Sequence, residues 1–373
     1  MKFLIRSKKI DTCYKHLRLF IWSGVVVRYF SFIGDRTVKT GIAVFLTALV
    51  CQWIGWPPVF AVITAIVTVE PTVSDSIKKG LIRFPASAIG SAFAVLFISL
   101  FGNSALTYAL AAVCTIVTCF RLKLHAGLLV ATLTAVAMVE VIHTNLLVAF
   151  FIRLGTTTIG LAVSTLVNMF ILPPKYRLHI FKRVTTIRMD TANLIEHTFQ
   201  AILEGKQENI PVKENLSKMD HAVLQTEQLS RFQKDEAKFH PLLKSEQEQF
   251  EQLQHQLSSL RIIHYHLNNL TRNPITELSW TEREKNTIMK AVYGVTKRLQ
   301  EDESYAVTVH QSQLKEITDL FWEDSEATIR SNPTSLTNFP PELIILYELV
   351  SIYHMVERFY SFDHVKIKRA TPN

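Results

Sequence analysis

Residues 83–123 read RFPASAIGSAFAVLFISLFGNSALTYALAAVCTIVTCFRLK, two long apolar stretches joined by Gly102-Asn103 and bounded by basic residues at both ends. The same arrangement extends over residues 39–173, where six apolar stretches alternate with short connectors: 40–54, 57–73, 84–101, 104–120, 124–142 and 145–172. A helix that spans the bilayer needs about 20 apolar residues. Because most of the stretches approach this length, the pattern predicts six transmembrane helices.

The connectors between these stretches differ in charge. Residues 55–58, 102–103 and 143–144 contain no Lys or Arg, whereas every intervening connector is basic, with charges at Arg36, Lys39, Lys78, Lys79, Arg83, Arg121, Lys123, Lys175 and Arg177. Cytoplasmic loops of membrane proteins carry an excess of Lys and Arg, so we expect both termini to be cytoplasmic. A soluble all-α protein is the alternative. Six nearly uncharged stretches in succession disfavour it.

The chain changes character after residue 174. In residues 175–373 apolar residues recur at helical spacing, most regularly in the stripe Phe250, Leu253, Leu257 and Leu260, and Thr281 with Glu284 has the spacing of a capping box. We therefore expect an all-α fold with a six-helix transmembrane module (37–174) and a cytoplasmic bundle of about five or six helices (175–373). The first bundle helix is expected to continue from the last membrane helix past Pro173-Pro174.

The formal net charge of +8 is concentrated in the first 40 residues and at the basic connectors. This placement suits anionic lipid headgroups, and no nucleic-acid-binding motif accompanies it. Residues 1–36 are interpreted as a basic amphipathic segment on the inner leaflet, or as the product of an upstream start codon. The sequence lacks the phosphate-binding, dinucleotide-binding, zinc-protease and serine-hydrolase motifs. We therefore expect no enzyme activity, cofactor or metal site.

Two segments of the apolar half match each other. Residues 83–93 read RFPASAIGSAF and residues 153–163 read RLGTTTIGLAV, so that Arg, Ile-Gly and a following Ala recur at the same offsets. The first segment begins the third predicted span and the second lies in the sixth, so the two would cross the membrane in opposite directions. That is the geometry of an inverted repeat of three plus three helices, which is common in transporters. Small residues in these segments also allow close helix packing, and this second interpretation stays open.

An ionisable residue within a membrane-spanning stretch costs free energy, so such residues are candidates for a functional site. The sequence offers Glu70, Glu140, His143 and Arg153. A buried arginine can hold a carboxylate through two parallel hydrogen bonds, and a membrane glutamate such as Glu70 could accept an exchanged proton. In the competing interpretation Arg153, Glu140 and His143 lie among the headgroups and Glu70 pairs with a lysine on the cytoplasmic side.

Several short motifs carry a resemblance to a known family: Lys39-Thr40-Gly41-Ile42-Ala43, Glu70-Pro71-Thr72, Ser76-Ile77-Lys78-Lys79-Gly80 with Arg83, Arg153 with Ile159-Gly160, Val167-Asn168, and Pro173-Pro174-Lys175-Tyr176. Over residues 34–365 the chain resembles the aromatic acid exporter family of Gram-positive bacteria, which is distantly related to fusaric acid resistance proteins. The resemblance implies a six-span module joined to a helical C-terminal domain in the bacterial plasma membrane, and export of aromatic carboxylates.

Two classes of function follow from these observations. The first is a secondary exporter, driven by the proton gradient, that moves small carboxylates, aromatic ones among them, out of the cell. The second is a multi-pass membrane protein that transports nothing and whose cytoplasmic bundle acts as a scaffold or sensor. A six-span unit is small for alternating access, so the exporter interpretation also predicts a homo-oligomer. The expected partners are the lipid bilayer and a small organic anion.

Overall fold

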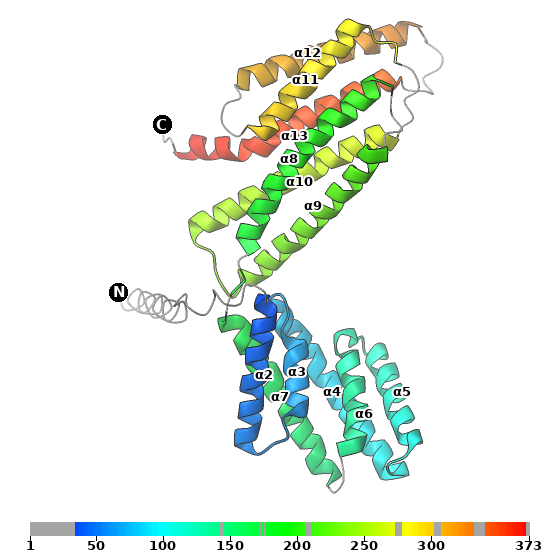
Figure 1. The fold of residues 1–373 in the computed structure, drawn as a ribbon, viewed down its shortest axis with the longest axis vertical. Coiled ribbons are helices and arrows are strands. Elements are labelled where there is room, and N and C mark those ends of the chain that lie inside the picture. The colour runs from blue at the N-terminus through cyan, green and yellow to red at the C-terminus, as the bar shows by residue number, and fades with distance from the viewer. Residues whose placement is uncertain are drawn as a thin grey trace. The chain divides into compact units, whose positions relative to one another are not determined.

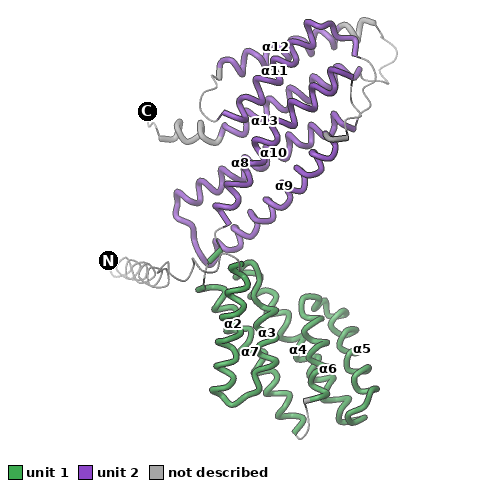
Figure 2. The backbone as a smooth tube through the Cα atoms, viewed as in Figure 1, with its two compact units in different colours: residues 1–174 green, residues 175–373 purple. Residues whose placement is uncertain are grey.

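The structure is a computed structural model that describes residues 34–141, 145–171, 173–174, 176–205, 210–272, 278–301, 307–331 and 340–370. Over these ranges all of the regular secondary structure is helical, which confirms the predicted all-α class. The chain divides into two compact units, residues 1–174 and 175–373 (Figures 1 and 2). Residues 1–33, the greater part of the predicted amphipathic segment, lie outside the described residues.

The first unit is built from apolar helices: α2 (Asp35–Ile54), α3 (Val59–Thr68), α4 (Val73–Phe101), α5 (Ala105–Arg121), α6 (Leu128–Val141), which follows a short 3-10 turn at His125–Gly127, and α7 (Leu146–Phe170). Three of them, α2, α4 and α7, are long and apolar enough to cross a membrane. The other three, α3, α5 and α6, are apolar but shorter. The described residues therefore contain three candidate spans, where the sequence pattern predicts six.

Helices of the first unit pack in two groups around the pair formed by α4 and α7. Helices α2 and α3 pack against each other and against α7, whereas α5 and α6 pack against each other and against α4. Figure 1 shows these groups as neighbouring sets of helices. The two long helices α4 and α7 contact one another and so join the groups.

Helix α3 ends at Thr68, short of the predicted end of the apolar stretch at residue 73. The cause is Pro71, which has no N–H to donate and disfavours helical geometry in the residue before it. Val69 and Thr72 accordingly adopt extended conformations, and α4 begins at Val73. The connection of residues 69–72 is therefore an interruption between two helices.

A pair of prolines, Pro173 and Pro174, lies between the two units in the sequence. Helix α7 ends at Phe170, Ile171 is extended, and the next helix begins only at Tyr176. The expectation of one helix that continues past Pro173-Pro174 was therefore wrong. Two successive residues without a backbone N–H cannot continue the hydrogen-bond ladder of a helix.

The second unit consists of α8 (Tyr176–Leu203), α9 (Ile210–Glu236), α10 (Lys244–Arg272), α11 (Glu282–Gln300), α12 (Val307–Ser331) and α13 (Pro341–Ala370). Helix α8 packs against α9, α10 and α11, and α10 also packs against α13. The stripe of α10 predicted from the sequence faces the core, since Leu253, Leu257 and Leu260 are all buried. The capping box of Thr281 and Glu284 at the start of α11 is also confirmed.

We expect Leu260→Asp to destabilise the second unit by at least about 3 kcal/mol, because it places an unpaired carboxylate at a fully buried position of α10. Thermal unfolding of the purified full-length chain, followed by far-ultraviolet circular dichroism, measures the effect. Ser258→Asp on the exposed side of the same helix is the matched control. Equal melting temperatures for the two variants would contradict the assignment of α10 to the core.

Candidate functional site

The interruption between α3 and α4 places a carboxylate inside the apolar unit. Glu70 lies in the extended connection and is only 9% exposed, and the neighbouring Val69, Thr72 and Val73 are fully buried. Backbone groups that are shielded from water need internal hydrogen-bond partners, and an irregular segment at membrane depth is tolerated only under that condition. The side chains around Glu70 meet this requirement.

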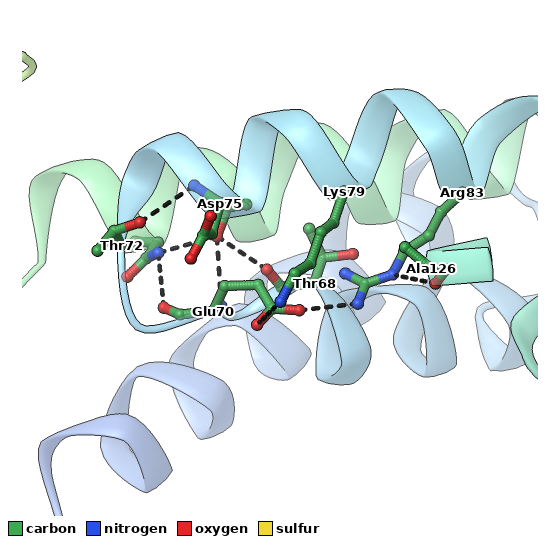
Figure 3. Close-up of polar contacts among 9 residues, drawn as sticks. Thr68, Glu70, Thr72, Asp75, Lys79, Arg83 and Ala126 are labelled. Carbon is green, nitrogen blue, oxygen red and sulfur yellow. Dashed lines mark hydrogen bonds and ion pairs between the residues drawn. The ribbon is translucent and has the colours of Figure 1, made fainter. Parts of the chain in front are cut away.

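Both oxygens of the Glu70 carboxylate are held by cations from α4. Arg83 donates from Nη2 to Oε1 at 2.7 Å, and Lys79 donates from Nζ to Oε2 at 2.9 Å (Figure 3). Arg83 in addition donates from Nε to the carbonyl oxygen of Ala126, at 3.2 Å. Lys79 and Arg83 lie four residues apart and therefore on the same face of α4. The carboxylate thus ties the end of α3 to the first three turns of α4.

Asn168 of α7 and Ser76 of α4 satisfy the backbone of the interruption. The Asn168 side-chain amide donates to the Glu70 carbonyl oxygen at 3.0 Å and to Ser76 Oγ at 2.9 Å. Ser76 Oγ in turn donates to the Thr68 carbonyl oxygen at 2.9 Å and accepts from the Glu70 N–H at 3.3 Å. The carbonyl group that ends α3 and both backbone groups of Glu70 are therefore hydrogen-bonded.

A third cation reaches this network through Asn168. The Lys39 ammonium of α2 donates to Asn168 Oδ1 at 3.0 Å, and the Lys39 side chain is buried. We refer to Lys39, Glu70, Ser76, Lys79, Arg83 and Asn168 as the Glu70 cluster. It joins the interruption to three helices, α2, α4 and α7.

Arg153 of α7 forms a separate site. Its side chain is 2% exposed, Nη2 donates to the hydroxyl of Thr134 on α6, and the guanidinium carbon lies 4.3 Å from the centre of the Phe60 ring on α3. Its Nε and Nη1 have no hydrogen-bond partner among the described residues. The structure thus buries a permanent cation whose neighbours here are a neutral hydroxyl and an aromatic face. A partner anion would stabilise it strongly.

The remaining two candidates lie apart from both sites. Glu140 is exposed near the end of α6 and accepts a hydrogen bond of 2.7 Å from the Tyr108 hydroxyl of α5. His143 lies outside the described residues. The structure therefore does not bring Glu70 and Arg153 together, because each has its own set of neighbours. Glu70 pairs with a lysine, Lys79, as one of the two interpretations of the sequence anticipated.

Sequence reasoning missed the residues that complete these sites. Arg83, Asn168 and Lys39 bind the interruption, but the pattern analysis treated them as topology signals or as parts of a motif. In the sequence each is only a polar residue within or beside an apolar stretch, and its burial appears in the structure alone. Phe60 and Thr134 gave no signal, because a phenylalanine and a threonine are ordinary residues of a membrane helix.

We expect Glu70→Gln and Arg83→Gln each to lower the melting temperature of the purified chain, because each leaves a buried partner without its counter-charge. In a double-mutant cycle, the double variant should lose less free energy of unfolding than the sum of the losses in the two single variants. The expected difference is about 1–3 kcal/mol. Lys78→Gln, at an exposed position of the same helix, is the control and should change little. Strict additivity would show that the ion pair contributes nothing to the fold.

Comparisons with known proteins identify a family and several relatives. Residues 31–171 match the family described as aromatic acid exporter family member 1. A UPF0421 protein of Oceanobacillus iheyensis is 50% identical over 332 residues, which cover 88% of this chain and 96% of that protein. A UPF0421 protein of Bacillus cereus is 44% identical over 332 residues (89% and 94%), and one of Staphylococcus haemolyticus is 36% identical over 338 residues (89% and 98%).

The matched segment contains every residue of the Glu70 cluster together with Arg153. The matched residues cover nearly the whole length of these three relatives, and the identities are well above 30%. The chain therefore belongs to the aromatic acid exporter family, a family of transporters.

Proposed function

We propose that this protein is a secondary transporter that exports small carboxylates, including aromatic ones, and that Arg153 binds the carboxylate group of the substrate. Family membership supports transport in general terms. The observation that carries the finer proposal is the buried guanidinium of Arg153, which has two nitrogens without a hydrogen-bond partner among the described residues. No described acidic side chain forms an ion pair with it.

The chemistry of Arg153 fits an aromatic carboxylate. A guanidinium presents a planar fork of N–H donors that matches the two oxygens of a carboxylate. In an environment from which water is excluded, such charge-assisted bonds are stronger than in water. The Phe60 ring against the guanidinium adds an aromatic surface next to the anion-binding groups. Binding would therefore combine a charged anchor with an apolar contact for the remainder of the substrate.

Glu70 has a different role in this proposal. Arg83 and Lys79 hold both oxygens of the Glu70 carboxylate, which suits a fixed structural pairing more than proton exchange. The Glu70 cluster would then hold the α3–α4 interruption rigid while the Arg153 site binds substrate.

The proposal places the first unit in the bacterial plasma membrane with six crossings, both termini in the cytoplasm, and the second unit as a cytoplasmic domain. The shorter helices α3, α5 and α6 would complete their crossings with their flanking connections. A single six-helix unit is small, so we also propose a homo-oligomer.

We expect everted membrane vesicles that contain the protein to take up labelled benzoate when a proton gradient is imposed. Arg153→Lys keeps the charge but loses the fork, so uptake should fall about tenfold at unchanged membrane abundance, the loss expected for one hydrogen bond to a charged group. Arg121→Lys, an exposed arginine at the end of α5, is the control and should retain uptake.

Two outcomes of this assay would count against the proposal. Uptake by Arg153→Lys equal to that of the unchanged protein would place the carboxylate site elsewhere. The absence of gradient-dependent uptake of benzoate and of aliphatic carboxylates would favour the alternative, a membrane protein that transports nothing.

The orientation can be tested with single cysteines in a variant that lacks the four native ones. Cysteine at Asn103 or Asn145, both exposed, should react with an impermeant maleimide added to intact cells, because the proposal places these connectors outside. Cysteine at the exposed Lys78 should react only after the cells are opened. The reverse pattern would contradict cytoplasmic termini.

A further inference from the structure

The two halves of the first unit correspond to one another at a constant offset of 70 residues. Over residues 61–92 and 131–162 the following pairs are identical: Ala61/Ala131, Thr64/Thr134, Ala65/Ala135, Val69/Val139, Glu70/Glu140, Ile82/Ile152, Arg83/Arg153, Ile89/Ile159, Gly90/Gly160 and Ala92/Ala162. The match is longer than the Arg and Ile-Gly motif alone. Both members of the Glu70–Arg83 ion pair recur, as Glu140 and Arg153.

Side-chain and backbone contacts follow the same offset. A Cβ atom on Gly90 would lie 2.3 Å from the carbonyl oxygen of Ala131, and one on Gly160 would lie 2.4 Å from that of Ala61. The matching residues Ser87 and Thr157 contact each other, with their hydroxyl oxygens 3.4 Å apart. Where two equivalent halves are related by a two-fold axis, equivalent residues contact each other at that axis, as Ser87 and Thr157 do. The contact of Gly90 with Ala131 is likewise equivalent to the contact of Gly160 with Ala61.

The arrangement of helices obeys the same symmetry. Helix α3 corresponds to α6 and α4 to α7, and the packing of α3 on α7 corresponds to that of α6 on α4. The two groups in Figure 1, α2 with α3 and α7, and α5 with α6 and α4, are therefore equivalent. Inverted repeats of this kind allow a transporter to expose one central site alternately to the two sides of the membrane.

The two equivalent ion-pair positions differ in the structure. In the first half Glu70 lies beyond the end of α3 and binds Arg83. In the second half α6 continues helically through Glu140 to Val141, and Glu140 binds the Tyr108 hydroxyl instead of Arg153. The sequence accounts for the difference at one position, since Val141 stands where the first half has Pro71, and valine does not force the helix to end.

We infer that Glu140 is the alternate partner of Arg153, so that Glu140 and the transported carboxylate compete for the same guanidinium, and that Tyr108 holds Glu140 away in the state seen here. This inference rests on the proposed role of Arg153. Met138 is equivalent to Thr68, the last residue of α3. If the last turn of α6 unwound beyond Met138, Glu140 would lie beyond the end of its helix, as Glu70 does. The second half would then resemble the first.

Competition of this kind solves a physical problem for an exporter. A buried arginine without a counter-charge is costly in an apolar environment, and one bound permanently to an internal carboxylate could not bind substrate. If Glu140 pairs with Arg153 once the substrate has left, the cation stays neutralised during the return step. The apparent affinity for substrate then depends on the fraction of molecules in which Glu140 is withdrawn.

The test measures benzoate affinity of the purified full-length chain by isothermal titration calorimetry. Glu140→Gln removes the competing charge and should lower the dissociation constant, by up to about tenfold for one charged hydrogen bond. Tyr108→Phe removes the hydroxyl that holds Glu140 away, so it should raise the dissociation constant. The double variant should behave as Glu140→Gln alone, because the tyrosine acts only through the glutamate. Arg153→Gln should abolish binding.

The possible failures are distinguishable. If the unchanged protein binds benzoate, Arg153→Gln does not, and neither Glu140→Gln nor Tyr108→Phe changes the affinity, the Arg153 site stands and competition by Glu140 is refuted. The same holds if the two variants shift the affinity in the same direction. If Arg153→Gln binds as well as the unchanged protein, or no variant binds benzoate, the proposed site itself is refuted, and the competition with it.

Discussion

The pairing of the Glu70 carboxylate with Arg83 and Lys79 is the interaction on which the first unit depends. Pro71 ends α3 inside an apolar structure, and the backbone that it exposes must find partners within the protein. Asn168 and Ser76 supply them, while the two cations hold the interruption against α4. A helix break at this position is stable only because residues from three different helices converge on it.

Comparison with the Glu70–Arg83 ion pair shows what Arg153 lacks. The unit contains two equivalent arginines, and in the state described here one has a carboxylate partner while the other lies against a hydroxyl and an aromatic ring. In the inverted repeat that we infer, the two positions are equivalent, and the difference between them reflects the state of the protein and the identity of residues such as Pro71 and Val141. In the proposed transporter this asymmetry has a purpose, since the Arg153 site must be able to exist without its substrate.

Long apolar stretches and the stripe of α10 could be predicted from the sequence, because they depend on residue periodicity over one helix. The capping box at Thr281 could be predicted for the same reason. The end of α3 at Thr68 and the break after Phe170 follow from Pro71 and from Pro173-Pro174, and the predicted helices ran past these prolines. The Glu70 cluster could not be predicted, since it joins Asn168 to a residue 98 positions away. The repeat was recognised only through the Arg and Ile-Gly motif, although the further identities at an offset of 70 residues are present in the sequence. What the sequence could not show is that equivalent positions such as Ser87 and Thr157 contact each other.

The central claim is that Arg153 binds the carboxylate of the substrate, and a distance measurement addresses it directly. Solid-state nuclear magnetic resonance can measure the separation between the carboxylate carbon of ¹³C-labelled benzoate and the guanidinium nitrogens of ¹⁵N-arginine-labelled protein in lipid. The account predicts a carbon–nitrogen distance typical of direct ion pairing, about 3–4 Å, and its loss in Arg153→Lys. Bound benzoate with no short distance to any arginine, or with one that persists in that variant, would contradict it.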